Sequence, residues 1–255
     1  MKVTIITPSF NSVKTIARTI ESIKKQTYPN IEHIVIDACS SDGTLELLNK
    51  MGVRYVSEPD SGIYHAMNKG IRIASGDIIH ILNSDDWYSA NDIVSNVVDL
   101  MESGDYDVCH AYVSLVNTCG NEVWRVGSDV KKDDLFNKMQ VAHPSCFIRS
   151  SVYQRFGDFS CSFKIAADYD FILRIWSKIN VIFLPRQVVQ MRMEGISNSH
   201  PVRSYKESMA VAIIHGKGLW KALFTFYYQC IKHYLILLAR SNGYTNTKTQ
   251  HENTY

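Results

Sequence analysis

The sequence predicts an α/β fold in which a mixed sheet is flanked by helices and followed by a helical C-terminal extension. In the first half, short apolar runs alternate with segments whose apolar residues recur at helical spacing. This alternation is typical of a parallel, doubly wound sheet. In the second half, strand-like runs follow one another around polar turns, which indicates an antiparallel part. The 255 residues are enough to bury a sizeable core.

The first half divides into strands, helices and the polar loops between them. Strands are expected over residues 3–7, 31–37, 53–57 and 78–82. Asn11 or Ser12 can cap a helix that runs to about Gln26, Asp42 can cap the next, and a third is expected over 62–74. Ligands of such sheets bind beyond the carboxyl ends of the strands. A site is therefore expected where four polar loops meet, at residues 7–11, 37–42, 58–62 and 83–86.

The second half contains both helices and strands. Helices are expected over residues 91–102, from Ser150, and over 166–178, 202–215 and 219–240. Strands are expected over 106–116, 122–126, 145–149, 181–184 and 188–193. We divide the chain into a main domain (1–200), a C-terminal helical extension (201–241) and a polar tail (242–255) that we expect to be disordered.

Composition and charge narrow the class of protein. The chain is 45% hydrophobic and 20% charged, and its net charge of +2 argues against a dedicated nucleic-acid binder. Residues 201–255 hold seven Lys or Arg and two Asp or Glu, so they carry +5 and the first 200 residues carry −3. This asymmetry suggests an anionic surface as a partner.

Three further features predict a cytoplasmic protein. The N-terminus starts with a strand-like run and shows no secretory signal. The six cysteines show neither a C-x-x-C pair nor zinc-like spacing, so we expect reduced thiols. No apolar run reaches the roughly 20 residues that a transmembrane helix needs.

Residues 78–87 are the most informative segment, because an apolar strand runs directly into Asn83, Ser84 and the adjacent Asp85 and Asp86. Paired carboxylates at a sheet edge are costly unless they are solvated, paired or metal-bound. Carboxylate oxygens suit Mg²⁺ or Mn²⁺, and such ions usually share their ligands with substrate phosphates. The alternative is a strand followed by an ordinary turn, since Asn, Ser and Asp are common turn formers.

Two other strand-to-helix loops carry candidate binding groups. Asp37 follows an apolar run, where its carboxylate could accept hydrogen bonds from a nucleotide base or ribose. In residues 57–70, backbone amides at a helix start could receive phosphate or ribose oxygens. The alternatives are that Asp60 caps this helix and that Lys69 is a solvated charge.

The second half adds three candidates. Asp168 lies at a helix start, where an acidic residue is commonly a cap or a dipole partner. Its functional alternative is a general base, which needs a carboxylate within hydrogen-bond reach of an acceptor hydroxyl. Arg192 or His200 could meet a diphosphate, or either could lie on the surface.

Taken together, these motifs resemble the family 2 inverting glycosyltransferases with the GT-A (Rossmann-like) fold. The resemblance runs from residue 3 to about residue 197. It rests on five pieces in family order: Thr7-Pro8-Ser9-Phe10-Asn11; Ile36-Asp37 with Ser41-Asp42-Gly43-Thr44; Glu58-Pro59-Asp60 with Gly62-Ile63-Tyr64 and Ala66-Met67-Asn68-Lys69-Gly70; Asn83-Ser84-Asp85-Asp86; and Ala167-Asp168-Tyr169-Asp170. The residues in these motifs are similar to those of bacterial enzymes that build O-antigen, capsule or colanic-acid repeat units.

The resemblance implies a nucleotide-diphosphate sugar as donor and a lipid-diphosphate-linked glycan as acceptor. It implies Asp168 as the catalytic base and Mn²⁺ or Mg²⁺ as cofactor, with Asp86 and His200 as candidate metal ligands. The candidate nucleotide-sugar residues are Thr7, Ser9, Asn11, Asp37, Asp60, Lys69, Asn83, Asp85 and Arg192. Many relatives carry a second Asp where this chain has Ala38, so Asp37 must substitute for it or the base contact is lost.

The C-terminal segment suggests a second partner. It mixes aromatic with basic residues, a combination that suits the surface of an anionic bilayer. These are Trp220, Phe224, Tyr227, Tyr228 and Tyr234 with Lys217, Lys221, Lys232 and Arg240. Such a contact would hold the protein at the inner face of the plasma membrane. The alternative is a helix packed on the main domain.

Two other functions remain open. A sugar-phosphate nucleotidyltransferase also needs acidic metal ligands, but its expected Gly-rich, basic loop after the first strand is missing, since residues 7–12 contain neither Gly nor Lys. A non-catalytic nucleotide-sugar-binding protein would keep Asp37 and Asp86 and need no carboxylate at Asp168.

Overall fold

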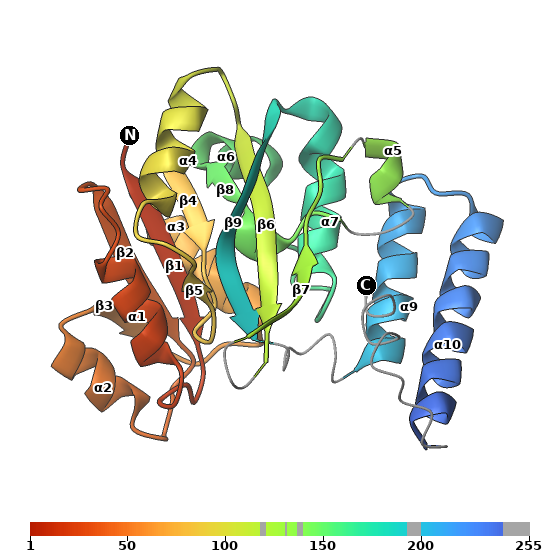
Figure 1. The fold of residues 1–255 in the computed structure, drawn as a ribbon, viewed down its shortest axis with the longest axis horizontal. Helices are drawn as coiled ribbons and strands as arrows, with labels where there is room; N and C mark the ends of the chain where they lie inside the picture. Colours follow the sequence, from red (N-terminus) through yellow and green to blue (C-terminus); the bar gives the residue numbers. More distant parts are fainter. Residues whose placement is uncertain (118–120, 131, 137–139, 193–199, 242–255) are drawn as a thin grey trace.

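A computed structural model describes residues 1–117, 121–130, 132–136, 140–192 and 200–241, and its nine described strands form one mixed sheet (Figure 1). The strand order is β3-β2-β1-β4-β8-β6-β9-β5, with β7 paired to β6. The four strands of the first half are parallel, as predicted: β1 (Val3–Ser9), β2 (Ile31–Asp37), β3 (Arg54–Ser57) and β4 (Ile78–Ile81). The carboxyl ends of β1, β2 and β4 therefore meet at one edge.

Strand β8 (Phe147–Arg149) joins the two halves, because it pairs antiparallel with both β4 and β6 (Val108–Val116). Strand β7 (Glu122–Val126) extends β6 as the predicted antiparallel piece. Strand β9 (Val181–Arg192) runs parallel to β6, and the short β5 (Trp87–Tyr88), which the sequence did not predict, pairs with β9.

The prediction of two strands at residues 181–184 and 188–193 was wrong, because β9 is continuous through Pro185. The register explains why. Ala111 of β6 pairs with Leu184, but the next residue, Tyr112, pairs with Gln187, so Pro185 and Arg186 lie in a bulge. Proline has no N–H for the ladder, and a bulge places it where none is needed.

Helices cover both faces of the sheet (Figure 1). Three of them, α3 (Ile63–Ile73), α6 (Ser150–Phe156) and α7 (Ala167–Ile175), enclose the largest core cluster, whose sheet residues include Ile6, Ile34 and Ile36. The other face is covered by α1 (Ile16–Lys24), α2 (Thr44–Met51) and α4 (Ile93–Glu102). The single helix predicted over 166–178 ends at Ile175 and continues as a 3₁₀ turn, Trp176–Lys178. Short helices at Lys132–Leu135 (α5) and His143–Ser145 (η1) were also missed.

The predicted helix caps are partly correct. Helix α1 starts at Ile16, and it is the backbone carbonyl of Ser12 that accepts the N–H groups of Thr15 and Ile16. The carboxylate of Asp42 accepts the N–H of Thr44, the first residue of α2, at 3.1 Å. The loop residue Asn11 has a φ of 49°, a conformation that Asn tolerates better than most residues.

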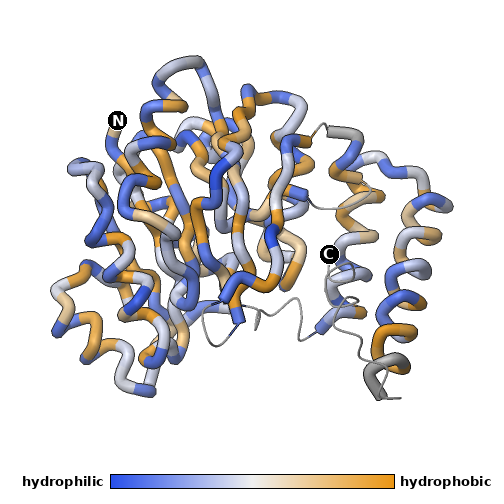
Figure 2. Tube along the Cα trace, viewed as in Figure 1, coloured by the Kyte–Doolittle hydropathy of each residue, from blue (hydrophilic) through white to orange (hydrophobic). Residues whose placement is uncertain are grey.

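The C-terminal extension consists of two helices, α9 (Pro201–Ile214) and α10 (Leu219–Ser241). Helix α9 packs against α7 and contributes Val211 and Ala212 to the main core, and α10 lies outside α9 (Figure 1). Figure 2 shows that apolar and polar residues both occur along α10. No helix in the described ranges is long and apolar enough to cross a membrane. The predicted tail, 242–255, lies outside the described residues.

Candidate active site

The acidic loop is held at the ends of the parallel strands. In the register of β1 and β2, Ser9 lies opposite Asp37, and the N–H of Leu82 continues the pairing of β4 by donating to the carbonyl of Ile6 at 3.0 Å. The loop 83–86 is then fixed to α1, where Thr19 Oγ1 donates to the carbonyl of Asp86 at 2.7 Å. The sheet thus brings the predicted Ser9, Asp37, Asn83 and Asp86 to one edge.

Asp86 is the most unusual group at this edge. It is only 1% exposed; its Oδ2 accepts the side-chain amide of Asn83 at 3.0 Å, and its Oδ1 has no hydrogen-bond partner among the described residues. Burial, followed by the charge of the neighbouring Asp85, raises the pKa of Asp86 well above its ordinary value, and Asn83 and the backbone of Arg192 offset this only in part. A buried carboxylate oxygen without a donor is a ready ligand for a cation.

Two more oxygens near Asp86 are orphaned in the same way. Asn83 Oδ1 and Ser9 Oγ are buried without a hydrogen-bond partner in the described structure. Buried polar atoms are normally paired, and unpaired ones commonly mark a site for an ion, water or ligand. These residues therefore fit a divalent cation and the polar groups of a bound ligand.

Among the described residues, Asp86 is not joined by a full set of side-chain ligands for a cation. In the described ranges, no cluster of three or more His, Cys, Asp or Glu could hold a metal. Mg²⁺ is usually held by one or two carboxylates together with phosphates and waters, so this shortage suits an ion shared with a diphosphate. His200 is exposed at the N-terminus of α9, and none of the described contacts joins it to Asp86, so its role as a ligand stays a prediction.

Asp37 is fully buried, and both of its oxygens are engaged by the protein. Its Oδ2 accepts the N–H of Ser40 at 2.9 Å and the hydroxyl of Ser57 at 2.8 Å, and its Oδ1 accepts the hydroxyl of Ser40 at 2.5 Å. These bonds hold the loop that contains Ala38 and the positive-φ residue Cys39. The structure thus assigns Asp37 a role in shaping the loop, and its contact with a base stays a prediction.

The other predicted donor-site residues have local partners. Thr7 Oγ1 is buried 3.0 Å from His33 Nε2, Asn11 Oδ1 accepts the N–H of Ser41, and Asp60 accepts the N–H of Gly62 at 2.9 Å. Lys69 is paired with Glu58 at 2.9 Å and also donates to the carbonyl of Pro59. Asp60 thus bonds to the loop just before α3 and does not cap it, since the N-cap is Gly62, and Lys69 is an ion-paired side chain and not the solvated charge of the alternative.

Asp168 lies in the first turn of α7 and is partly exposed. Its Oδ1 accepts the N–H of Tyr169 at 2.8 Å and lies 3.1 Å from the hydroxyl of Tyr64, which also donates to the carbonyl of Ile165 at 2.6 Å. The charge of Asp168 acts on His143, although burial dominates and lowers the pKa of that histidine. A partly exposed carboxylate that is held by a backbone N–H and lies beside a tyrosine hydroxyl is suited to accept a proton from a bound hydroxyl.

Three residues around the site were missed as functional candidates. Tyr64 lies in the loop and helix start at residues 57–70 that the sequence singled out, but nothing in the sequence indicated that Tyr64 contacts Asp168 or that the charge of Asp168 acts on His143. The guanidinium of Arg18 stacks 3.4 Å from the centre of the ring of Trp87, which follows Asp86 in the sequence. The positive charge of Arg192 also acts on Arg18. Burial, followed by Arg192, lowers the pKa of Arg18. Periodicity within α1 cannot reveal such a contact.

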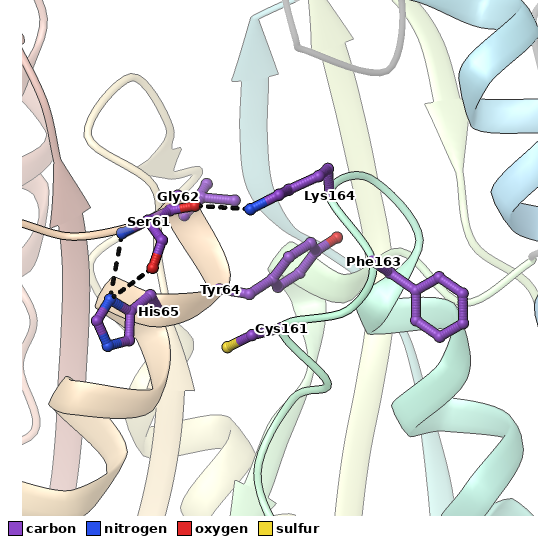
Figure 3. A pocket seen from close by; sticks show the side chains of 8 residues that line it. Ser61, Gly62, Tyr64, His65, Cys161, Phe163 and Lys164 are labelled. Carbon is purple, nitrogen blue, oxygen red and sulfur yellow. Dashed lines mark hydrogen bonds between the residues drawn. The ribbon is translucent and has the colours of Figure 1, made fainter.

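A small cavity lies between the start of α3 and residues 161–164 (Figure 3). Its volume of about 20 Å³ has room for about one water molecule and not for a sugar. Across it, Lys164 Nζ donates to the carbonyl of Ser61 at 2.9 Å. The cavity is therefore a small gap where the start of α3 contacts the segment before α7.

A family model described as Glycosyl transferase family 2 matches residues 4–157. The chain is 36% identical over 190 residues to an uncharacterised glycosyltransferase of Mycobacterium tuberculosis, covering 68% of each protein. It is 28% identical over 180 residues to a PGL/p-HBAD biosynthesis glycosyltransferase of Mycobacterium bovis, covering 68% of this chain and 69% of that protein. The sequence match thus extends over about two thirds of these relatives.

Solved structures share the fold at low identity. The S. aureus TarS 1–349 structure in complex with UDP-GlcNAc gives a TM-score of 0.70 at 19% identity, covering 89% of this chain and 70% of that one. The mannosyltransferase PcManGT from Pyrobaculum calidifontis, in complex with GDP-Man and Mn²⁺, gives 0.63 at 20% identity, covering 95% and 79%. Against a longer TarS chain, this protein spans 43% of the length. These likenesses confirm the predicted GT-A fold.

Proposed function

The chain belongs to glycosyl transferase family 2, and from this premise we propose that it is a metal-dependent inverting enzyme of bacterial surface-polysaccharide synthesis. It would move a sugar from a nucleotide-diphosphate sugar to a hydroxyl of a lipid-diphosphate-linked glycan. The observation that carries the proposal is the buried Asp86 with its unpartnered oxygen, at the sheet edge where β1, β2 and β4 end.

Asp86 and its neighbours form the donor side. A Mn²⁺ or Mg²⁺ ion held by Asp86 would supply a Lewis acid for the departing diphosphate. The orphaned Asn83 Oδ1 and Ser9 Oγ are available to the ion's waters or to the nucleotide. UDP-GlcNAc in the TarS structure, and GDP-Man with Mn²⁺ in the PcManGT structure, support a nucleotide sugar and a metal in this fold.

Asp168 forms the acceptor side. Its carboxylate takes the proton of the acceptor hydroxyl as the oxygen attacks the anomeric carbon. The carbon–oxygen bond to the diphosphate breaks, and its electron pair leaves with the nucleotide. Attack on the face opposite the leaving group inverts the configuration. Tyr64 and the Tyr169 N–H both approach Oδ1 of Asp168, which leaves Oδ2 for the incoming hydroxyl.

The test is sugar transfer by the Asp168→Asn variant. A general base contributes about 10²- to 10⁴-fold, so we expect transfer to fall by at least 10²-fold while nucleotide-sugar binding persists. Asp99→Asn, which changes an exposed carboxylate on α4, is the matched control. Donor screens with UDP-, GDP- and dTDP-sugars against a synthetic lipid-diphosphate glycan would identify the substrates.

The outcomes separate the alternatives. Near-normal transfer by the Asp168→Asn protein would remove the base. Formation of a nucleotide sugar from a nucleoside triphosphate and a sugar phosphate would favour the nucleotidyltransferase. Binding of a nucleotide sugar with neither transfer nor hydrolysis in the presence of metal would favour a non-catalytic binding protein.

We also propose that α10 lies on an anionic membrane surface, which would bring the enzyme to a lipid-linked acceptor. Residues spaced alternately by four and three positions occupy one face of a helix. On α10 this face, the outer stripe, is exposed over its whole length, from 82% at Trp220 to 39% at Leu238. The outer stripe consists of Trp220, Phe224, Tyr227, Ile231, Tyr234 and Leu238.

Charge selects the partner of the outer stripe. Residues 219–241 contain no Asp or Glu, and Lys221 and Lys232 lie on the same helix. Each Lys near an anionic bilayer gains about 1 kcal/mol, whereas a second copy of α10 would bring like charges together. Aromatic rings beside lysines are also characteristic of helices that lie in the membrane interface.

Vesicle flotation tests this contact. The protein should float with vesicles that contain anionic phospholipid and much less with neutral vesicles, and a Trp220→Glu/Phe224→Glu variant should remain in the soluble fraction. Trp124→Glu is the control, because Trp124 is an exposed aromatic on β7. Equal flotation of the double variant, or a dimer in solution that the double variant abolishes, would refute the membrane proposal.

A further inference from the structure

Helix α7, which presents Asp168, has no capping side chain of its own. Its N-cap residue is Ala166, and no side chain of the cap bonds to the first turn. The first N–H groups of a helix have no partner within the helix, and leaving them buried and unpaired is costly. In the first turn the N–H of Tyr169 bonds to Asp168 itself, and the backbone directly before the helix is held by an acceptor from elsewhere in the chain.

Glu207 of α9 supplies that acceptor. Its Oε2 accepts the N–H groups of Lys164, Ile165 and Ala166 at 2.9, 2.7 and 3.2 Å. The Glu207 side chain is only 14% exposed, and Arg203, one turn earlier on α9, pairs with its other oxygen at 3.0 Å. One carboxylate thus fixes three successive backbone groups directly before α7.

The segment held by Glu207 is also the segment that orients Asp168. The carbonyl of Ile165 accepts the Tyr64 hydroxyl, which lies 3.1 Å from Asp168 Oδ1. On the other side, Lys164 reaches across the small cavity to Ser61 (Figure 3). A shift of residues 164–166 would therefore move the Ile165 carbonyl that holds Tyr64 beside Asp168, and it would also move the start of α7, which carries Asp168.

A second polar contact joins α9 to α7. His215, at the end of α9, lies 2.9 Å from Asp170, and Asp170 also accepts the guanidinium of Arg174 at 2.7 Å. Both members of the His215–Asp170 pair are largely buried. Helix α9 is thus joined to the start of α7 by polar contacts from its middle, at Glu207, and from its C-terminal end, at His215.

We propose that Glu207 is a positioning residue for the catalytic base, so that the C-terminal extension takes part in catalysis without touching the substrate. The proposal rests on the proposed role of Asp168. Burial alone would raise the pKa of Glu207, but the three N–H groups and Arg203 outweigh it and lower that pKa, as expected for a carboxylate used in its charged form.

The test compares kcat with donor affinity in the full-length protein. Displacing a catalytic group by about 1 Å can cost roughly 10²-fold, so we expect kcat of Glu207→Ala to fall by about 10- to 100-fold. The donor-side residues Asp86, Asn83 and Ser9 lie outside α9, so the affinity and stoichiometry of nucleotide-sugar binding should change by less than about twofold. A merely stabilising role would reduce the folded fraction and therefore the binding stoichiometry.

Two further variants sharpen the result. Glu207→Gln keeps a carbonyl oxygen of the same reach, so it should recover most of kcat, whereas the shorter Glu207→Asp should not. Arg203→Ala removes the ion pair and leaves the three N–H contacts, so it should resemble the wild type. If Glu207→Ala does not fold, Glu207→Asp is read in the same way.

The failures are distinguishable. Normal kcat in folded Glu207→Ala, or equal losses of kcat and binding stoichiometry in Glu207→Asp, would overturn the positioning role. If Asp168→Asn itself keeps transfer activity, the proposed function fails first. If Asp168→Asn is inactive and Glu207→Ala is fully active, only the positioning role fails.

Discussion

Replacing Asp86 with Asn should stabilise the metal-free protein while it abolishes the response to metal. Asp86 is buried, one of its oxygens has no partner in the described structure, and burial together with Asp85 raises its pKa well above the ordinary value. An acid whose pKa is raised by folding penalises the folded state once pH exceeds the unfolded pKa of about 4. Asp86 therefore lowers the free energy of unfolding of the metal-free protein at neutral pH.

The size of the effect follows from what each side chain leaves unpaired. An uncompensated buried charge costs about 3–5 kcal/mol, and an unpaired neutral polar group costs about 1–3 kcal/mol. The substitution should thus stabilise the metal-free protein by about 2 kcal/mol. For a chain of this size, 1 kcal/mol shifts Tm by about 2–4 °C, so the expected gain is about 4–8 °C.

The assay is thermal unfolding of both proteins from pH 4 to pH 8, with EDTA or with Mn²⁺. The advantage of Asp86→Asn in EDTA should grow as pH rises above about 4, because the unfolded wild-type chain then releases a proton from Asp86 that the folded protein retains. Added Mn²⁺ with UDP should raise Tm of the wild type only. A lower Tm of Asp86→Asn in EDTA, or the same Mn²⁺ shift in both proteins, would refute the assignment.

Two other substitutions test the scaffold of the site. In Gly70→Ala, the new Cβ would lie 2.3 Å from Cγ2 of Ile6, so overpacking should lower the free energy of unfolding by about 1–3 kcal/mol; a urea midpoint that stays the same or rises would contradict the packing of α3 on β1. Asp37→Ala removes the acceptor for two serine hydroxyls and one N–H, which should cost about 3 kcal/mol and weaken UDP binding measured by calorimetry. Unchanged stability and binding would show that the loop does not depend on Asp37.

The parallel half of the fold was predictable because each signal lies within a short segment. The apolar run 31–37 and the helical spacing of 62–74 each report their own state, and the acidic loop follows from the end of one strand. The continuity of β9 depends instead on its partner, since the bulge opposite Ala111 and Tyr112 accommodates Pro185. No pattern inside residues 181–193 records that register.

The candidate site divides in the same way. The burial of Asp86 follows from the apolar strand before it, so the sequence could indicate a carboxylate in need of a cation. The local contacts of Asp60 and Lys69 could not be chosen over ligand contacts, because either role uses the same residue in the same loop. The orientation of Asp168 depends on Tyr64, about 100 positions away, and a single sequence without structure does not contain that proximity.

The C-terminal extension has one feature that its own sequence predicted and another that depends on contacts with distant segments. Its composition predicted a surface helix, and α10 has the exposed face that such a helix needs. Composition could not predict that α9 packs on the main domain. Its Val211 and Ala212 lie in the core, and its Glu207 bonds to the backbone just before α7. Because α10 packs on α9 and α9 holds that turn, the proposed membrane contact and the proposed base are separated by a single layer of helix. If both proposals hold, a substitution inside the α9–α10 interface should impair transfer on a vesicle-bound acceptor more than on a water-soluble one. Equal loss on both acceptors would leave α9 as a support for Asp168 that works independently of the membrane.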